Sequence, residues 1–569
     1  MTYAQVLPFE RRVDWSVAGV RDSTTSGFTM LDAVEEGLVN DGITPCDNPF
    51  SSIINNHEEP LIIYFPPGEY LFNSSIYMRS NLILRGSGAS NTKFIIDLNG
   101  SGNSVNINGS SSISDTTKIV NDLFKNESSI NVFNPSLLQE GDWVQIIQDD
   151  SDLITSSWAV NSIGQIAQIS TINNSTIQIE GSFRMDFPLS RNPLIKKINP
   201  IFNVGIECIS FERIDDCAPE QSSVIHFDYA FNCWVNGIES NKTTFAHVEA
   251  SHSSNVSVTH SYFHHGFEYG GGGRAYGVMY HFTTNECLVY CNSFEHLRHS
   301  MIVQAGANGN VFAYNRSIDP FWTEGTFFPS NSAGDMVLHG NYPYANLFEQ
   351  NDGQNIVIDN SHGSNGPFNT FFRNRGSLFG IFFSDNTSPS QNIIGNEIPN
   401  LSFPYSVVNY TILGANHFLY GNNNKGNISP TNTENLTDSS YFFISQPNTI
   451  PNDLYASIGV PNELNTGTIP ATYHHSTGNY FAQSCGYDSN LNVNTFKNEE
   501  TIIFPNPIQS GQELTISGQW ELVIWIDVSG RIIDQQDIRS LNISKLEPGT
   551  YHLKILTRNG WVNKAVIIQ

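Results

Sequence analysis

Histidine and arginine side chains gather in the middle of this chain. Eight of its sixteen histidines lie between His247 and His299, and residues 243–424 contain no lysine. The fixed positive charges of that stretch are Arg274, Arg298, Arg316, Arg373 and Arg375. Histidine exchanges a proton near neutral pH, and the planar guanidinium of arginine binds a carboxylate or sulfate through two parallel hydrogen bonds. The composition therefore predicts proton transfer beside a bound anion.

A column of polar residues recurs through the same region at a nearly constant interval. Its members are His281, Gln304, His339, Asp359 and Ser384, spaced by 23, 35, 20 and 25 residues. An asparagine column keeps step with it: Asn292, Asn315, Asn351, Asn374 and Asn396, spaced by 23, 36, 23 and 22 residues. Periods of this size indicate stacked repeats, each burying its apolar residues against the next. The one long interval indicates a coil with an insertion.

Short apolar runs rich in β-branched and aromatic residues lie between these columns. They are 277–280, 301–303, 336–338, 356–358 and 381–383. No helix-length pattern separates them, so we predict an all-β, right-handed parallel β-helix. Because side chains alternate along a strand, Val278 and Tyr280 should point into the coil, whereas Met279 and His281 should point out. The asparagines should occupy buried turns and bond to their neighbours above and below.

The polar column is expected to form a linear site. Adjacent coils stack about 4.8 Å apart, so outward side chains one coil apart are about one sugar ring apart. We therefore expect His281, Gln304 and His339 to line a groove along the solenoid axis, with Asp359 one step beyond. Proton transfer is assigned to three histidines and anion binding to two arginines that precede the strands. These candidate catalytic residues are His281, His299, His339, Arg274 and Arg298.

Residues that orient the substrate are expected beside the catalytic candidates. The long coil carries about thirteen extra residues around Asp319, which we expect to fold over the groove with Trp322 as a stacking platform for a sugar. The candidate substrate-binding residues are Gln304, Asp359, Trp322, Glu324 and His265. A plainer interpretation stays open, because an outward histidine on a solenoid is often only a surface residue.

Two further motifs have structural interpretations that we prefer. The glycine run 270–273 resembles a phosphate-binding loop, but no helix follows it, so a turn is favoured. The His264–His265 pair lacks a cysteine or carboxylate at ligand spacing and therefore gives little reason to expect a metal. The metal ligands remain unknown. Calcium is the cofactor to test, although the sequence contains no clear cluster of oxygen ligands.

The overall composition narrows the class of partner. The chain has 569 residues, 39% of them hydrophobic and 14% charged, which fits a long, well-buried β solenoid. Its formal charge of −27 argues against nucleic acid or an anionic membrane as partner. No apolar run approaches the length of a membrane span. The seven cysteines lack zinc-ribbon spacing. Most should be buried and free, and Cys208 with Cys233, one coil apart, is the pair to test for a disulfide.

The first third of the chain contains an extended run and an interruption. The run Ile62-Ile-Tyr-Phe-Pro-Pro-Gly-Glu-Tyr-Leu-Phe precedes Leu82-Ile-Leu-Arg-Gly-Ser-Gly. These segments resemble the opening of the pectate-lyase superfamily of β-helix proteins, although Val20-Arg-Asp-Ser-Thr-Thr replaces the usual Gly-Asp-Gly segment. Before them, the spacing of apolar residues over 28–38 predicts a capping helix. Residues 115–198 break the solenoid pattern and are typical of hairpins in a small inserted β unit.

The C-terminal region contains four short motifs in order. They are Phe504-Pro-Asn-Pro, Ile526-Asp-Val-Ser-Gly-Arg, Leu546-Glu-Pro-Gly-Thr-Tyr and Lys564-Ala-Val-Ile-Ile-Gln. This β-sandwich-like module resembles the sorting domain of type IX secretion substrates, which implies the type IX machinery as a partner and a secreted or cell-surface location. The segment Met1-Thr-Tyr-Ala-Gln-Val is too short for an apolar signal. We expect a shortened signal peptide cleaved near Tyr3-Ala-Gln.

Five regions follow from these patterns. They are an N-terminal cap with the first coils (1–114), an inserted β unit (115–198), a central β-helix with the site (199–440), a C-terminal cap and linker (441–498) and a sorting domain (499–569).

Three classes of function fit the candidate residues. A lyase acting on an acidic, uronic-acid-containing polysaccharide must neutralise a carboxylate, remove the neighbouring proton and protonate the leaving oxygen, which histidine and arginine can do. A glycoside hydrolase needs two carboxyl groups and would have to borrow Glu268, Asp319 or Glu324 from loops. A non-catalytic glycan binder or adhesin needs neither. We predict a secreted carbohydrate-active enzyme, with a β-eliminating polysaccharide lyase as the preferred activity.

Overall fold

The computed structural model describes most of the chain. Described are residues 6–478 except 22, 24, 325–331 and 408, and, near the C-terminus, 503–504, 508, 515–516, 520–526, 532–536, 548–557 and 560–568. The chain divides into two compact units. The first comprises residues 1–442 with 446–491, and the second comprises residues 443–445 with 492–569.

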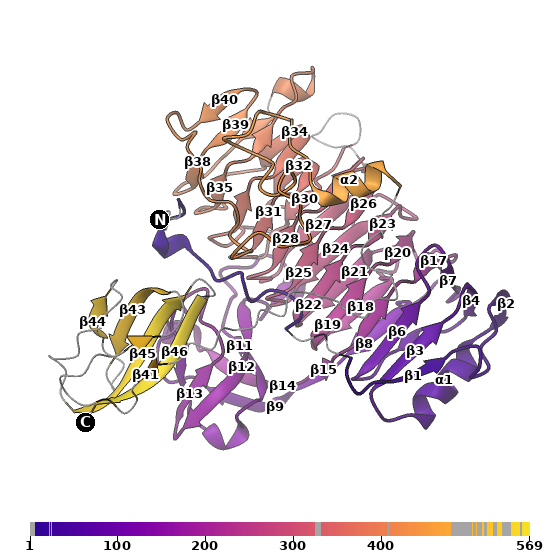
Figure 1. Ribbon diagram of the computed structural model, residues 1–569, viewed down its shortest axis with the longest axis horizontal. Helices are drawn as coiled ribbons and strands as arrows, with labels where there is room; N and C mark the ends of the chain where they lie inside the picture. The colour runs from indigo at the N-terminus through magenta and orange to yellow at the C-terminus, as the bar shows by residue number, and fades with distance from the viewer. Residues whose placement is uncertain are drawn as a thin grey trace. The chain divides into compact units, whose positions relative to one another are not determined.

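A parallel β-helix forms most of the first unit (Figure 1). One of its faces is a sheet of successive parallel strands: β1 (Thr29–Asp32), β3 (Leu61–Phe65), β6 (Leu82–Gly86), β16 (Gly205–Glu207), β19 (Ala230–Asn236), β22 (Ser254–Thr259), β25 (Leu288–Tyr290), β28 (Val311–Ala313), β31 (Leu347–Glu349), β33 (Thr370–Phe372), β35 (Asn392–Ile394) and β38 (Phe418–Tyr420), with β15 (Ile201–Phe202) beside β19. The predicted parallel β-helix is therefore confirmed.

The other two faces are ladders of one large sheet. The first ladder, called here the β26 face, contains β2 (Asp41–Pro45), β4 (Gly68–Phe72), β7 (Thr92–Ile96), β17 (Ser210–Arg213), β20 (Glu239–Asn241), β23 (Tyr262–His264), β26 (Ser293–Glu295), β29 (Arg316–Ile318), β36 (Glu397–Ile398), β39 (Asn422–Asn424) and β40 (Asn427–Ser429). The second, called here the β24 face, contains β5 (Ile76–Tyr77), β8 (Val105–Asn108), β18 (Ile225–Asp228), β21 (Ala246–Ser251), β24 (Tyr276–His281), β27 (His299–Val303), β30 (Met336–Leu338) and β37 (Tyr410–Thr411). The long strands β32 (Asp352–Ile358) and β34 (Arg375–Phe383) belong to both ladders.

The predicted alternation of side chains holds on the β24 face. Val278 and Tyr280 belong to the large cluster inside the coils, whereas Met279 packs in a separate outer cluster with Ile302 and Val337. Stacking like residues in register buries each coil against the next, which is how a solenoid acquires a continuous core.

The asparagine column forms the predicted ladder at a buried turn. Asn292 Nδ2 donates to Asn315 Oδ1 at 3.0 Å, and the same contact repeats along the column to Asn422. Each side chain also donates to a backbone carbonyl of the preceding coil, as Asn315 does to Val289. The ladder thereby satisfies turn amides that burial would otherwise leave without partners. A second ladder runs through Asn310, Asn346 and Asn369.

The N-terminal cap differs from the prediction. Residues 29–32 form β1, which pairs in parallel with β3, and the helix α1 comes later, at Asp47–Asn56. Helical spacing over 28–38 was misleading because pairing with β3 satisfies this backbone, while α1 buries Phe50 and Ile53 against the open end of the core. The short helix η1 (Phe9–Arg11) precedes the cap.

The inserted region is a six-stranded antiparallel sheet with its own apolar core (Figure 1). In order of pairing its strands are β10 (Ser129–Asn131), β13 (Thr176–Ile179), β12 (Gly164–Asn173), β11 (Trp143–Ile147), β14 (Leu194–Asn199) and β9 (Ser110–Lys118). Three short helices connect them: η2 (Pro135–Leu137), η3 (Ser157–Ala159) and η4 (Leu189–Arg191).

The short helix η6 (Tyr405–Val407) lies between β36 and β37, and the last coils are followed by loops and the helix α2 (Pro470–Ser476). The second unit contains β41 (Ile503–Phe504), β42 (Thr515–Ile516), β43 (Trp520–Ile526), β44 (Ile532–Gln536), β45 (Gly549–Thr557) and β46 (Gly560–Ile568). The last four form an antiparallel sheet in the order β44-β43-β45-β46, over a core that includes Trp525 and Leu553. Within the described residues, no helix is long and apolar enough to cross a membrane.

Cys208 and Cys233, the pair to test for a disulfide, are not bonded to each other. Cys208 is disulfide-bonded, but Cys233 is a free thiol buried in the solenoid core. Cys233 packs inside the coils among apolar residues. Burial there raises the pKa of its thiol to about 12. The other described free cysteines are also buried.

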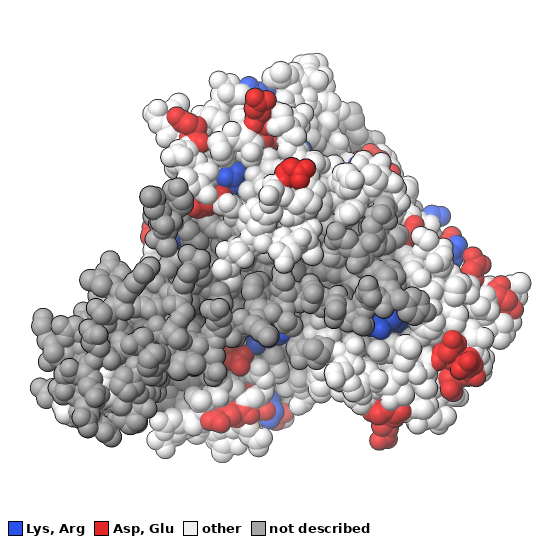
Figure 2. Space-filling model, in the orientation of Figure 1, with Lys and Arg blue, Asp and Glu red and all other residues white. Residues whose placement is uncertain are grey.

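On the face drawn in Figure 2, the acidic side chains of the described residues lie in several separate groups, and basic side chains are fewer. An anion would need a local positive group to bind, because the net negative charge of this chain repels it.

Candidate functional site

The polar column has the register that the sequence predicts. Strand pairing aligns Tyr280 with Val303, Val303 with Leu338 and Leu338 with Ile358, so the residues that follow them are aligned as well. These following residues are His281, Gln304, His339 and Asp359. These side chains are largely buried, since His281, Gln304 and His339 are 5%, 7% and 5% exposed. The groove expected along the column stays a prediction.

His339 and Asp359 form a pair at the centre of a histidine cluster. Asp359 Oδ2 lies 2.7 Å from His339 Nδ1. The His339 ring lies 5.4 Å from that of His299 and 4.9 Å from that of His362. Burial alone would raise the pKa of the Asp359 carboxyl, but His339 and the hydroxyl and amide of Ser361 outweigh it and hold the pKa below its ordinary value. The carboxylate is therefore ionised, and one of its oxygens faces His339 Nδ1.

His299 is held as a neutral base. Its Nδ1 lies 3.0 Å from the carbonyl oxygen of Gly334. A carbonyl can only accept, so Nδ1 carries the proton and Nε2 keeps a lone pair. Burial lowers the pKa of His299 well below its ordinary value, and the charges of Arg298 and His339 lower it further. The ring therefore stays unprotonated at neutral pH.

Arg298 supplies a buried positive charge beside these rings. Its guanidinium lies 4.8 Å from the ring centre of Trp322 and 5.8 Å from that of Tyr276. One terminal nitrogen donates to the Gly270 carbonyl at 2.7 Å. Its Nε is buried and has no hydrogen-bond partner within the described part of the chain. A buried donor without a partner is costly, and a substrate anion would satisfy it.

His281 belongs to a second pair on the same face. Its Nε2 lies 2.7 Å from Ser251 Oγ and 3.0 Å from Glu249 Oε1. Ser223 donates to the other oxygen of Glu249 at 2.6 Å. Burial would raise the pKa of Glu249, but His281, His226 and Ser223 lower it to about 2. His281 lies two coils from His339, about 10 Å at the usual spacing of strands.

The remaining predicted residues lie around this cluster or away from it. Arg274 lies two residues before β24, the strand that begins at Tyr276, and pairs with Glu268 at 3.3 Å. Glu324 is exposed and accepts a hydrogen bond from the Gly271 amide, so it braces the glycine turn. His265 lies apart, in contact with His264 and His296 at the β26 face.

Three residues near the pair were missed from the sequence. His362 follows Asp359 by three residues, a spacing that points to a common turn. Tyr276 contacts His299, with ring centres 5.1 Å apart. Trp158 belongs to the inserted unit and contacts His362 at 5.4 Å between ring centres. Only tertiary docking brings Trp158 here, and no local pattern signals it.

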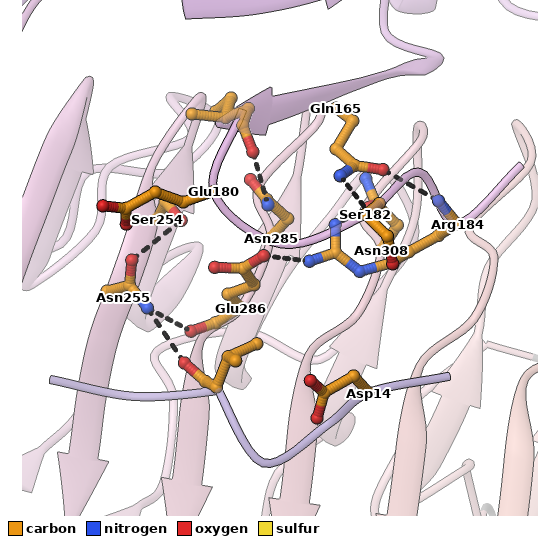
Figure 3. Close-up of polar contacts among 12 residues, drawn as sticks. Asp14, Gln165, Glu180, Ser182, Arg184, Ser254, Asn255, Asn285, Glu286 and Asn308 are labelled. Atoms are coloured by element: carbon orange, nitrogen blue, oxygen red, sulfur yellow. Dashed lines mark hydrogen bonds and ion pairs between the residues drawn. The ribbon is translucent and has the colours of Figure 1, made fainter. Parts of the chain in front are cut away.

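The inserted unit docks on the β-helix through buried polar contacts. Figure 3 shows Arg184 of the inserted unit directed at Glu286, with Asn308 and Gln165 beside it. Asn308 Nδ2 also donates to the Gly164 carbonyl at 3.1 Å. An added Cβ at Gly309 would lie 2.3 Å from Arg184 Nε, so this glycine leaves room for the guanidinium. The docking fixes the inserted unit against the turns that follow β24 and β27.

Among the residues that the structure describes, no group of three or more His, Cys, Asp or Glu side chains is arranged to hold a metal ion.

Comparison with known proteins identifies the two parts of the chain. Residues 30–182 match the family model described as "Rhamnogalacturonase A/epimerase, pectate lyase-like". Residues 502–569 match the secretion system C-terminal sorting domain. The first match lies within the β-helix unit, and the second lies within the C-terminal unit. No curated protein matches this chain.

The solved structures that are similar to this chain are distant from it in sequence. The tailspike gp61 of Pseudomonas phage phi297 is 12% identical, over 68% of this chain and 66% of its own length, with a TM-score of 0.47. The A-module of the mannuronan C-5 epimerase AlgE4 of Azotobacter vinelandii is 8% identical over 69% and 95%, with a TM-score of 0.35. PfbA, a surface adhesin of Streptococcus pneumoniae, is 14% identical over 65% and 85%, with a TM-score of 0.36.

Proposed function

We propose that this protein is a secreted lyase that cleaves an acidic polysaccharide by β-elimination. The observation that carries the proposal is the joint arrangement of His299, held as a neutral base, and His339, whose protonated form Asp359 stabilises. Arg298, with an unpartnered Nε among the described contacts, completes the set of groups that the reaction needs.

Each group has one role in the proposed reaction. Arg298 binds the carboxylate of a uronic acid and makes the proton on the adjacent carbon more acidic. His299 Nε2 takes that proton, and the electron pair left behind forms a carbon–carbon double bond. The bond to the glycosidic oxygen breaks, and His339 gives its proton to the leaving oxygen. Asp359 holds the His339 ring and its positive charge before that transfer.

Hydrolysis has less support from the same residues. A hydrolase needs two carboxyl groups about 5–9.5 Å apart. Asp359 is paired with His339, and Glu249 lies four coils away, about 19 Å at the spacing of paired strands. Asp335 points into the coil, where Ser317 and the amides of residues 354 and 355 bind its carboxylate.

The sorting domain supports a location outside the cytoplasm. We propose that the type IX secretion machinery recognises this domain and that the β-helix acts on polysaccharide at the cell surface or beyond.

The test is turnover of defined substrates by the full chain. Polygalacturonate, rhamnogalacturonan, alginate and glucuronan are incubated with the protein while ultraviolet absorbance and reducing ends are followed in parallel. A rise in both signals, lost in His299→Ala, supports β-elimination at this site. Reducing ends without absorbance would instead establish hydrolysis, and silence in both signals would favour a glycan binder.

A further inference from the structure

An arm of the inserted unit, residues 154–162, reaches the histidine cluster of the β24 face. Two backbone amides of the arm, those of Thr155 and Ser156, donate to Asn341 Oδ1 at 3.0 and 3.2 Å. At its other end, Thr283 Oγ1 donates to the Ser162 carbonyl at 2.6 Å. The arm is thus fixed at both ends to turns of the β-helix.

Small residues of the β-helix make room for this arm. In earlier coils the turn after the polar column carries the aromatic rings of Tyr229, His252 and Phe282, stacked with centres 4.7 and 5.5 Å apart. The next two coils have Ala305 and Gly340 at this turn. The residue after Ala305 is also small, and a Cβ added there, at Gly306, would lie 2.0 Å from the Ser162 carbonyl oxygen. The ring stack therefore stops where the arm begins.

The arm places one large aromatic ring beside the site. Trp158 contacts Phe282 edge to face at 5.9 Å and His362 at 5.4 Å, and His362 contacts His339. Despite these contacts, Trp158 remains 45% exposed. An exposed tryptophan next to buried polar groups is unusual in a packed surface and common where a ligand is bound.

We propose that Trp158 is a saccharide-binding platform, against which one sugar ring of the polysaccharide stacks next to the unit held at His339. Asn341 is its positioning residue. The inference rests on the proposed function for the identity of the neighbouring site, but it concerns binding and not chemistry. The apolar face of a pyranose ring covers the exposed indole, and the chain then continues toward Arg298, which holds a uronate carboxylate.

Binding of size-defined oligosaccharides from the same four polysaccharides tests the platform directly. Calorimetric titration of the full chain with Trp158→Ala is expected to weaken binding about tenfold or more, and Trp158→Phe less. Phe133→Ala is the matched control, because Phe133 is an aromatic residue of the same unit that is 78% exposed. Its affinity should equal that of the unmodified protein.

A second pair of variants changes Asn341, which holds the arm, and leaves Trp158 itself unsubstituted. Asn341 has a φ of 51° and an Nδ2 with no partner in the described structure, so only its oxygen holds the arm. Asn341→Asp keeps that acceptor and should retain affinity. Asn341→Gly removes the acceptor, tolerates the positive φ and should weaken binding as Trp158→Ala does. Near-ultraviolet circular dichroism and the thermal midpoint confirm that each variant is folded.

The outcomes separate this inference from the proposed function. Binding that depends on Trp158 without any unsaturated product would retain the platform and reject the lyase. Product formation by Trp158→Ala with unchanged KM and affinity would reject the platform and retain the lyase. If the unmodified chain binds none of the four oligosaccharide sets, the platform is rejected.

Discussion

Two histidine–carboxylate pairs lie on the β24 face, and they differ in how deeply their carboxylates are buried. In the first pair, both oxygens of Glu249 are engaged, by His281 and Ser223, and Ser251 also contacts His281. In the second, both oxygens of Asp359 are engaged as well, by Ser361 and His339, but the Asp359 side chain is 23% exposed against 11% for Glu249. We expect the more buried pair to stabilise the fold and the more exposed pair, with the nearby Arg298, to act on a ligand.

Single substitutions at the candidate base and in the more buried pair test this assignment. The largest effect is expected for His299→Ala, which removes the proposed base. The rate of product formation should fall by about 10²–10⁴, the range for general base catalysis, while oligosaccharide affinity changes little. His281→Ala, in the pair with Glu249, should lower the rate of product formation much less. Initial rates by ultraviolet absorbance decide this, and equal losses in the two variants would erase the distinction.

Carboxylate-to-amide substitutions should affect turnover in one pair and the free energy of unfolding in the other. Asp359→Asn is expected to lower the turnover number on the order of a hundredfold with a small change in stability, because His339 loses the charge that stabilises its proton. Glu249→Gln should instead lower the free energy of unfolding by about 1–3 kcal/mol, because buried partners are left mispaired. Denaturant titration and steady-state kinetics on both variants measure this. A catalytic loss confined to Glu249→Gln would reverse our assignment.

The stability of the fold in acid should depend on the pair formed by Glu249 and His281. The pKa of Glu249 in the folded protein is about 2, below its ordinary value of 4.5. Its contribution to stability is therefore present above pH 4.5 and is lost as the pH falls toward 2. Glu249→Gln should flatten the stability profile in that window. Denaturation midpoints measured across the window check the prediction, and an unchanged slope would contradict it.

The smallest expected effect is a shift of the acid limb in the profile of activity against pH. Protonation of His299 removes the base, and the pKa of this ring lies below the ordinary 6.5. Activity should therefore persist below pH 6.5. Arg298→Gln removes a charge that helps to lower the pKa of His299, so the limb of its residual activity should move to higher pH. Rate profiles against pH test both statements, and a limb that stays in place in Arg298→Gln would exclude this coupling.

Periodicity in the sequence predicted the solenoid and much of the site. The two columns depend only on the repeat length, and each coil repeats the same turn, so Asn315 or His339 could be assigned to a position without knowing the rest of the chain. Alternation along a strand then gave the direction of Met279 and Tyr280. The capping helix failed because apolar spacing over a short segment fits a strand and a turn as well as a helix.

Features that depend on distant segments could not be predicted in this way. Trp158 and Arg184 reach the β-helix because the inserted unit docks as a body, and Gly306 and Gly309 matter only because this unit lies against them. The burial of His281 and Gln304 follows from packing around the column. The pairing of Cys208 depended on neighbours that coil spacing does not reveal.

The sequence by itself determined the repeat, the strand register and the order of His281, Gln304, His339 and Asp359, because stacked coils convert a period in sequence into a line in space. Only the tertiary structure decided how deeply each of these side chains is buried and which groups it meets. Those groups include hydrogen-bond partners such as Ser223 and Ser251, and an arm inserted more than a hundred residues earlier in the chain. Burial and partner count are properties of contacts, and a single sequence does not specify contacts between distant segments.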